Sequence, residues 1–296
     1  MKNRLVTLLL AGLLWLPITS AQIVNPNKVK YGKFSEAELA LQQYPQAPEA
    51  EAVILFDKGE LRMEYDLSTG GFEMVMDRHL RIKILQASGT DYGDFSFLLE
   101  NSSATSAKEE IGGVKGMTVN VEEGKIVETK LEKESIFREE VSERLDRLTI
   151  SFPQVKEGAI IDLKYTFRSD FLYNLPTWYF QHSIPTDYSY FSAVIPEYFY
   201  YNLDMKGYSS TSLKESVVGE LGTRSINVGT AVGNKLDFTT RGYRWTAIEV
   251  PGMQAEDFAP NVRNYFFRVD FELASVNFPG QLASQFSLSW DDVADT

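Results

Sequence analysis

The sequence predicts a mainly β protein, a large antiparallel β-sandwich of about a dozen strands with one or two short helices. Apolar and polar residues alternate over many short segments, and turn-forming residues separate these segments. Strands do not alternate with long amphipathic helices, so a parallel α/β sheet is not predicted. Hydrophobic residues make up 44% of the 296-residue chain and aromatic residues 13%, which is enough for a substantial core.

Residues 1–21 have the pattern of a secretory signal peptide. Lys2 and Arg4 precede an apolar run from Leu5 to Leu16, and Thr19-Ser20-Ala21 supplies small residues for cleavage. A membrane-anchoring helix is the alternative, but about 12 apolar residues are few for crossing a bilayer. No cysteine is present at the cleavage point to carry a lipid. We therefore expect an exported protein of the periplasm or cell envelope of a Gram-negative bacterium, not a lipoprotein, with no membrane span after cleavage.

Composition excludes several kinds of chemistry. The chain has no cysteine, so disulfides, thiolate metal sites and a cysteine nucleophile are absent. Its net charge is −12, and removal of the two positive charges of the signal gives −14. An acidic protein repels nucleic-acid phosphates, so we expect no nucleic acid among its partners.

Residues 22–50 are predicted to be a lead-in with one short helix. Ser35 and Glu38 have the spacing of a capping box, and the helix is expected to run to Gln43. The segment Tyr44-Pro-Gln-Ala-Pro48 then ends it. Residues 51–288 are predicted to form the β-sandwich domain.

The first part of this domain reads as strands and hairpins. Asp57–Glu60 is predicted to be a turn between the first two strands, and Gly70-Gly71 a second turn. In the third strand His79, Arg81 and Lys83 share the polar face. The predicted segments are Val53–Phe56, Leu61–Leu67, Phe72–Leu85, Asp94–Leu99 and a hairpin from Val114 to Leu131.

The middle of the chain supplies the strongest pattern. Leu148–Phe152 and Ala159–Phe167 both alternate, and the turn Pro153–Gly158 predicts that they pair as an antiparallel hairpin. The charged run Glu132–Arg147 before it fits either a short helix or an edge strand.

An aromatic belt follows, and it is expected to hold two sheets together. Consecutive rings in a strand point to opposite faces, so at most half of the belt can be exposed. Its members are Trp178, Tyr179, Phe180, Tyr188, Tyr190, Phe191, Tyr198, Phe199, Tyr200 and Tyr201.

The last third predicts further strands and then a break. Residues 206–234 are rich in Gly, Ser and Thr and are expected to be a hairpin or long loop. Residues 289–296 begin with an N-cap and two acids, so we expect the start of a helix that leads into a following, absent domain. The predicted strands are Glu197–Met205, Lys235–Thr240 and Tyr243–Val250, the last two around a turn at Arg241-Gly242, and Tyr265–Val276.

No catalytic, cofactor-binding or metal-binding residues are predicted, and no cofactor. His79 is expected on the surface or in a simple hydrogen bond, and His182 packed at a sheet end; convergence of the two on a metal is not expected. Gly229–Gly233 lacks the context of a phosphate-binding loop. Adjacent acids are read as solvated faces rather than a hydrolytic pair; these are Glu109-Glu110, Glu122-Glu123, Glu139-Glu140 and Asp291-Asp292.

Several segments resemble the domain-of-unknown-function 3857 family. That family is a β-rich domain found N-terminal to transglutaminase-like domains in exported bacterial proteins. The resemblance covers roughly residues 40–290. The matching segments are Tyr44-Pro-x-x-Pro-Glu-Ala-x-Ala52, Val53-Ile-Leu-Phe-Asp-Lys-Gly59, Arg78-His-Leu-Arg-Ile-Lys-Ile-Leu85, Gly124-Lys-Ile-Val127, Thr129-Lys-Leu131, Phe152-Pro-Gln-Val-Lys-Glu-Gly158, Trp178-x-Phe-Gln181 and Ile195-Pro-Glu-Tyr-Phe199.

The resemblance implies a companion module without catalytic machinery, because the chain has no cysteine to match the neighbour's nucleophile. The first hypothesis is therefore an exported, non-enzymatic domain that flanks or positions a transglutaminase- or protease-like partner, in the same chain or another. The alternative is a self-standing glycan- or polypeptide-binding module that uses exposed rings of the aromatic belt. A carboxylate-based hydrolase ranks last.

Overall fold

The computed structural model describes residues 23–207, 212–227, 235–254 and 261–286. The signal-peptide prediction for residues 1–21 and the helix predicted at 289–296 therefore lie outside the described residues. Most of the predicted β-sandwich domain lies within them.

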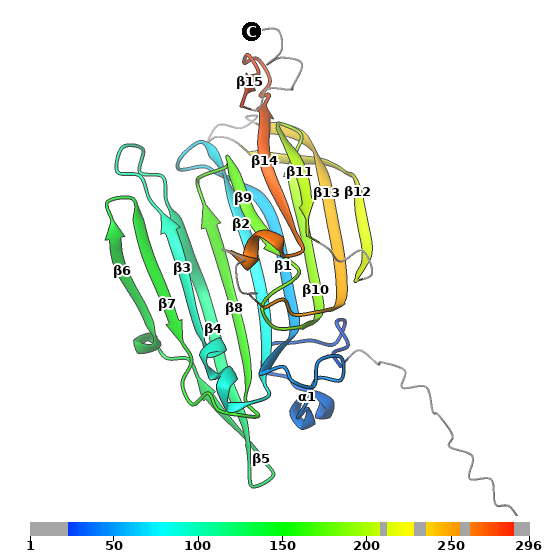
Figure 1. Ribbon diagram of the computed structural model, residues 1–296. Helices are drawn as coiled ribbons and strands as arrows, with labels where there is room; N and C mark the ends of the chain where they lie inside the picture. The colour runs from blue at the N-terminus through cyan, green and yellow to red at the C-terminus, as the bar shows by residue number, and fades with distance from the viewer. Residues whose placement is uncertain (1–22, 208–211, 228–234, 255–260, 287–296) are drawn as a thin grey trace, which may run out of the picture.

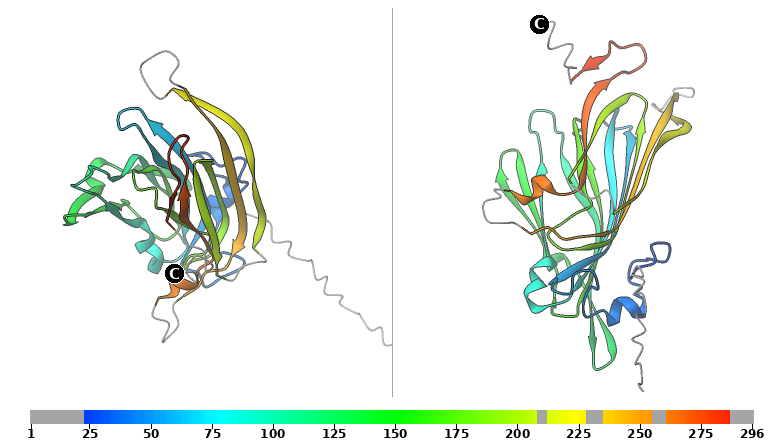
Figure 2. Two further views of the ribbon diagram at one scale, coloured as in Figure 1. Left: turned by 90° about the horizontal axis from the view of Figure 1, so that it is seen from above. Right: turned by 45° about the vertical axis from the view of Figure 1, so that its right-hand side comes forward.

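The described residues form fifteen strands in three sheets, which confirms the mainly β, sandwich-like fold. An eight-stranded sheet makes one layer, and a three-stranded and a four-stranded sheet lie over the same face of it (Figure 1). The view from above in Figure 2 separates the two layers.

The three sheets differ in size and in the order in which their strands lie side by side. The eight-stranded sheet consists of β12 (Leu213–Asn227), β13 (Lys235–Val250), β10 (Thr186–Pro196), β1 (Ala52–Asp66), β2 (Gly71–Ile84), β8 (Ile160–Ser169), β4 (Glu109–Glu122) and β5 (Lys125–Lys130). The four-stranded sheet consists of β11 (Phe199–Lys206), β14 (Arg268–Val276), β15 (Ser284–Gln285) and β9 (Asn174–Tyr179). The three-stranded sheet consists of β3 (Asp94–Glu100), β7 (Leu145–Ser151) and β6 (Ile136–Ser142). The short helices are α1 (Glu36–Ala40), η1 (Ala87–Gly93), η2 (Lys133–Ser135) and η3 (Val262–Tyr265).

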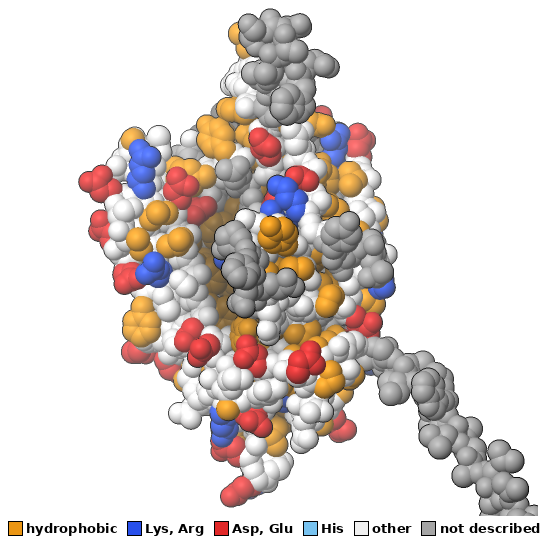
Figure 3. All heavy atoms as spheres, viewed as in Figure 1, with side chains coloured by type: hydrophobic (Ala, Val, Ile, Leu, Met, Phe, Trp, Pro, Cys, Tyr) orange, Lys and Arg blue, Asp and Glu red, His pale blue; other side chains and the backbone are white. Residues whose placement is uncertain are grey.

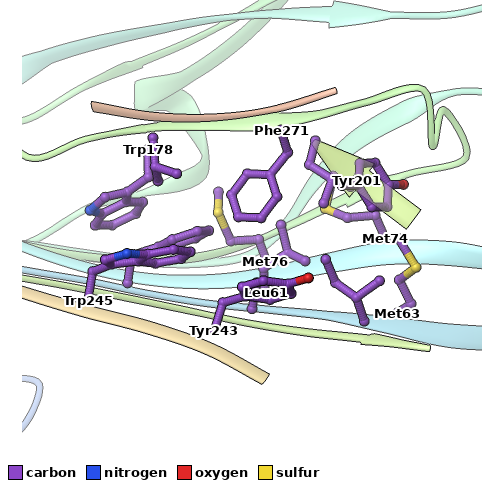
Figure 4. Close-up of a cluster of buried hydrophobic side chains, with 14 of the residues drawn as sticks. Leu61, Met63, Met74, Met76, Trp178, Tyr201, Tyr243, Trp245 and Phe271 are labelled. Atoms are coloured by element: carbon purple, nitrogen blue, oxygen red, sulfur yellow. The ribbon is translucent and has the colours of Figure 1, made fainter. Parts of the chain in front are cut away.

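The core is divided between the two smaller sheets. The larger cluster lies between the eight-stranded and four-stranded sheets, and Figure 4 shows its rings and methionines. Phe191 of β10 stacks on Trp178 of β9 with 4.9 Å between ring centroids, so the aromatic belt does join the two layers. A second cluster, including Leu148 and Ile161, lies under the three-stranded sheet.

Two predicted turns are wrong because the strands run through them. Asp57–Glu60 lies inside the continuous strand β1, with a bulge between Ile54 and Phe56. Arg241-Gly242 likewise lies inside β13. In both cases long pairing with neighbouring strands overrides the local turn propensity of Asp and Gly.

The predicted hairpin of residues 148–167 is also wrong. β7 pairs with β3 and β6, whereas β8 pairs with β2 and β4, so the two arms belong to different layers. The segment Pro153–Gly158 carries the chain from one layer to the other. Both edges of each arm are paired with other strands, and the alternation of apolar residues does not reveal which strands these are.

Three other expectations are settled by the same topology. The charged run 132–147 contains η2 and strand β6, so it is an edge strand and not a helix. Within 206–234, residues 213–227 form strand β12, which pairs antiparallel with β13, so the loop alternative is wrong and one arm of a hairpin is present. β1 and β10 pair in parallel, an exception to the expected antiparallel arrangement that the long crossover between them makes possible.

The lead-in covers part of the outer face of the eight-stranded sheet, opposite to the smaller sheets. The predicted capping box is present: Glu38 N–H donates to Ser35 Oγ over 3.2 Å, and Ser35 N–H donates to Glu38 Oε2 over 2.7 Å. The helix ends at Ala40 rather than Gln43. Apolar residues of the lead-in, such as Val24 and Tyr44, pack onto the sheet.

Candidate binding cleft

A cleft of about 550 Å³ lies between the three-stranded sheet and β9, over the eight-stranded sheet. Figure 3 shows this hollow with hydrophobic side chains inside it. Its floor comes from β2 and β8, with Leu80 and Ile82 among the apolar residues and Arg78 and Tyr165 among the polar ones. The cleft thus combines an apolar floor with a few polar groups, as ligand sites do.

The two walls of the cleft are edge strands. In the described part of the chain β3 pairs with β7 alone, and β9 pairs with β14 alone. The second layer is therefore interrupted between β3 and β9, and each strand turns its unpaired edge to the gap. Unpaired strand edges are templates for an additional strand.

The ladder between β3 and β7 fixes which backbone groups of β3 face the gap. Asn101 N–H donates to Arg144 C=O and Phe152 N–H to Gly93 C=O, so the odd-numbered residues of β3 bond toward β7. By the same alternation, the N–H and C=O of Ser96 and Leu98 point away from β7. Among the described residues neither backbone has a hydrogen-bond partner.

An ion pair lies at the floor of the cleft. Arg78 Nε and Nη2 donate to the two carboxylate oxygens of Asp57 over 2.8 and 2.7 Å, while Asp57 is fully buried. Burial opposes the charge of Arg78, but the Asp57 carboxylate outweighs it and the pKa of Arg78 is raised. The guanidinium also lies 4.9 Å from the ring of Trp178, which approaches the sheet closely because Gly59 has no Cβ there.

His182 lies beside this pair, with Nε2 3.8 Å from Asp57 Oδ2. The Nε2 atom is buried and has no hydrogen-bond partner among the described residues, although the side chain as a whole is 23% exposed. Burial lowers the pKa of His182 to about 4, so the ring is neutral at pH 7. The expected packed histidine is confirmed, and it also lines the cleft.

This geometry does not make a catalytic triad. The ring forms a hydrogen bond with the backbone of Tyr179, and Nε2 lies 3.8 Å from Asp57 without a hydrogen bond. Among the described residues no hydroxyl is hydrogen-bonded to Nε2, whereas a nucleophile and its general base need such a contact. The adjacent Ser183 hydroxyl pairs with Tyr92 instead.

His79 lies on the other face of β2 and does not meet His182. It is 8% exposed and pairs with Asp162 over 2.7 Å, so the expected hydrogen bond is present but the expected surface position is wrong. Arg81 joins the same carboxylate at 3.0 Å and Glu38 of the lead-in at 2.6 Å. Burial opposes ionisation of Asp162, but His79 and Arg81 hold its pKa below the ordinary value.

The remaining sequence-based candidates do not gather at one place. The glycine-rich segment 229–233 and the pair Asp291-Asp292 lie outside the described residues. In the described ranges no three His, Asp or Glu side chains are grouped as metal ligands. The belt rings are mostly buried, whereas Tyr200 is 53% exposed on β11, away from the cleft lining.

Sequence reasoning missed Asp57 and Arg78. Asp57 was assigned to a turn, and Arg78 was not singled out. One signal was available: Arg78 is in phase with Leu80 and Ile82, so an arginine stands on the apolar face of a strand. Such a residue needs a buried partner.

Comparison with known proteins gives a structural match for the fold. No protein-family model matches the chain, and no curated protein matches it. A protein from Parabacteroides distasonis, described as a "putative protease", has a similar fold with a TM-score of 0.53 and 15% identity. The match covers 76% of this chain and 41% of that protein, so the chain spans less than half of its length.

Two other solved structures overlap less well. Native yeast LTA4 hydrolase has a TM-score of 0.30 at 12% identity, with 79% of this chain and 31% of that chain covered. A "putative nutrient binding protein" from Legionella pneumophila has a TM-score of 0.28 at 6% identity, covering 76% and 68%. Neither score supports an argument. Over the described residues, no helix has the length and hydropathy needed to cross a bilayer.

Proposed function

We propose that this chain is a non-catalytic β module that binds an extended polypeptide segment in the cleft and presents it to a protease- or transglutaminase-like partner domain. The observation that carries the proposal is the gap in the second layer, which two unpaired strand edges border. A polypeptide strand is the ligand that uses both the edge and the apolar floor.

The edge of β3 is the better template of the two. Ser96 and Leu98 each offer one N–H and one C=O to the gap, which matches the spacing of an added strand. β9 contains Pro176, which has no N–H to donate, so pairing along that edge is restricted. The ligand is therefore proposed to add to β3 and to place alternate side chains on the floor beside Arg78 and Tyr165.

The role as a companion module draws on several supports. The chain contains no cysteine, so a cysteine nucleophile has to come from another domain or protein. A similar fold forms part of a longer protein described as a "putative protease". The resemblance to the domain-of-unknown-function 3857 family suggests the same neighbour, and the pattern of residues 1–21 suggests that the protein works outside the cytoplasm.

The test is selection of 12-residue peptides from a displayed library on the wild-type protein, followed by affinity measurement on two variants. Leu98→Pro removes an N–H from the edge that faces the cleft. Glu140→Pro is the matched control, because the same alternation directs its N–H to the outer edge of β6. We expect selected peptides to lose at least about tenfold in affinity for Leu98→Pro and to keep it for Glu140→Pro.

Circular dichroism and urea unfolding of both variants establish that each is folded before affinities are compared. Peptides that bind both variants equally, or a selection that yields no peptide sensitive to Leu98→Pro, would show that the cleft does not accept a strand.

A further inference from the structure

A row of basic side chains crosses the outer face of the eight-stranded sheet, opposite to the cleft. The strand registers place Lys58 against His79, His79 against Lys164, and Lys164 against Lys115, on four neighbouring strands. Directly opposed residues project from the same face with Cβ atoms about 5 Å apart. Like charges in this arrangement destabilise a sheet, and here they gather in a protein of net charge −12.

Two of these charges have no compensating partner. Lys58 pairs with Glu60 at 2.9 Å, so its charge is balanced. The nearby Asp77 already accepts hydrogen bonds from Arg62 and Thr166. In the part of the chain that the structure describes, neither Lys115 nor Lys164 makes an ion pair or a side-chain hydrogen bond.

A surface depression of about 410 Å³ contains both lysines. Pro26 and Val29 of the lead-in lie along one side of it, and Gly113 of β4 on another. The β4–β8 register shifts between Gly112 and Lys115, and Gly113 has φ 61°, so the strand bulges at this point. A bulge leaves an extra residue outside the ladder, and Gly113 of this bulge lines the same depression as the two lysines.

We propose that Lys115 and Lys164 bind a phosphate-type oxyanion in this depression. Two adjacent ammonium groups supply several donors and two positive charges to one compact anion, which removes their mutual repulsion. The site suits a single group rather than a nucleic acid, because Glu60 and Asp77 border it and would repel a chain of phosphates. Lys115 and Lys164 project from the face opposite the polypeptide cleft, although Arg78 and Tyr165 of the cleft floor also border the depression.

The experiment is titration of the protein with sodium phosphate at constant ionic strength, followed by NMR of backbone amides. We expect saturable shifts of Gly112, Gly113 and Lys115. The double variant K115Q/K164Q is expected to weaken binding at least about tenfold. K125Q/K130Q is the matched control, because it removes two exposed lysines from β5 and leaves the same net charge.

A second arm separates free phosphate from a lipid headgroup. Phosphatidylcholine vesicles with and without phosphatidylglycerol are sedimented with the wild type and both double variants. Cosedimentation that requires phosphatidylglycerol and is lost only in K115Q/K164Q identifies a headgroup, and phosphate shifts without cosedimentation identify a free ion. Equal weakening by both double variants overturns the proposal, and so does the absence of both saturable phosphate shifts and phosphatidylglycerol-dependent cosedimentation. Persistence of the shifts in Leu98→Pro distinguishes this site from the cleft.

Discussion

The two faces of β2 carry similar ion pairs in different surroundings. On the outer face, Arg81 is fully buried under the lead-in and contacts both Asp162 and Glu38. On the inner face, Arg78 keeps 21% of its side chain exposed and contacts Asp57 at the floor of an open cleft. The outer group is closed by the chain itself, whereas the inner group still faces a cavity.

The difference shows how to tell a structural charge cluster from a candidate binding site. The Arg81 group has its acceptors supplied within the chain, including the backbone carbonyl of Lys30 at 2.9 Å. The inner group leaves Nε2 of His182 buried without a hydrogen bond among the described residues. Buried polar atoms are normally paired, so an unpaired one beside a cavity indicates a place for a ligand or ordered water.

Loss of Arg81 is expected to have the largest effect on stability. Arg81→Ala leaves Asp162 and Glu38 buried without their cation, which costs about 3–5 kcal/mol in the free energy of unfolding. Urea unfolding measures this. Arg138→Ala is the control, because that arginine pairs with Asp146 on an exposed strand and its loss is expected to cost less than about 1 kcal/mol. Similar losses in the free energy of unfolding for Arg81→Ala and Arg138→Ala would contradict the view that Arg81 belongs to a buried structural ion cluster.

The contributions of Asp187 on the outer face and His182 on the inner face to the free energy of unfolding are expected to depend on pH in opposite directions. Burial raises the pKa of Asp187, which the lead-in contacts through Val24 N–H, to about 6. Its folded state binds more protons than the unfolded state between about pH 4 and 6, so stability from this group falls as pH rises. Burial lowers the pKa of His182 to about 4, so stability from His182 rises between about pH 4 and 6.5.

Each contribution reaches about 3 kcal/mol at most, and the two nearly cancel in the wild type. Relative to wild type, Asp187→Asn is expected to gain stability as pH rises from 4 to 6.5, and His182→Asn is expected to lose it. Urea unfolding at several pH values checks both directions. Differences from wild type that stay constant with pH would rule out this assignment.

A smaller effect is expected for the ion pair in the cleft. Asp57→Ala removes the carboxylate of Arg78, but the guanidinium keeps partial exposure and its contacts with Trp178 and Tyr165. The expected cost is about 2 kcal/mol, below that of Arg81→Ala. Chemical denaturation of the two variants side by side gives the comparison. A larger loss of unfolding free energy in Asp57→Ala than in Arg81→Ala would mean that the inner ion pair stabilises the fold more than the outer one.

The sequence allowed the fold class and many strands to be predicted, but not their partners. Alternation identified β2 and β3 well, because apolar and polar side chains alternate along both strands. It failed at 148–167, where alternation shows that a strand has an inner face but not which sheet supplies it. Asp57 and Gly59 were assigned to a turn because their long-range partners, Arg78 and Trp178, cannot be read from local propensity.

The cleft could not be predicted from the sequence. It depends on β3 and β9 being edges of separate sheets, and 80 residues between their starts give no sign of that separation. His79 was expected on the surface or in a hydrogen bond; the hydrogen bond is present, but the lead-in covers part of the polar face of β2 and His79 is buried.

The most direct test is amide hydrogen exchange along β3 with and without a selected peptide. We expect the amides of Ser96 and Leu98 to exchange fast in the free protein and to become protected when the peptide binds. The amides of Phe95 and Phe97, which bond toward β7, are predicted to change little. Protection that appears elsewhere while Ser96 and Leu98 continue to exchange fast would contradict strand addition in the cleft.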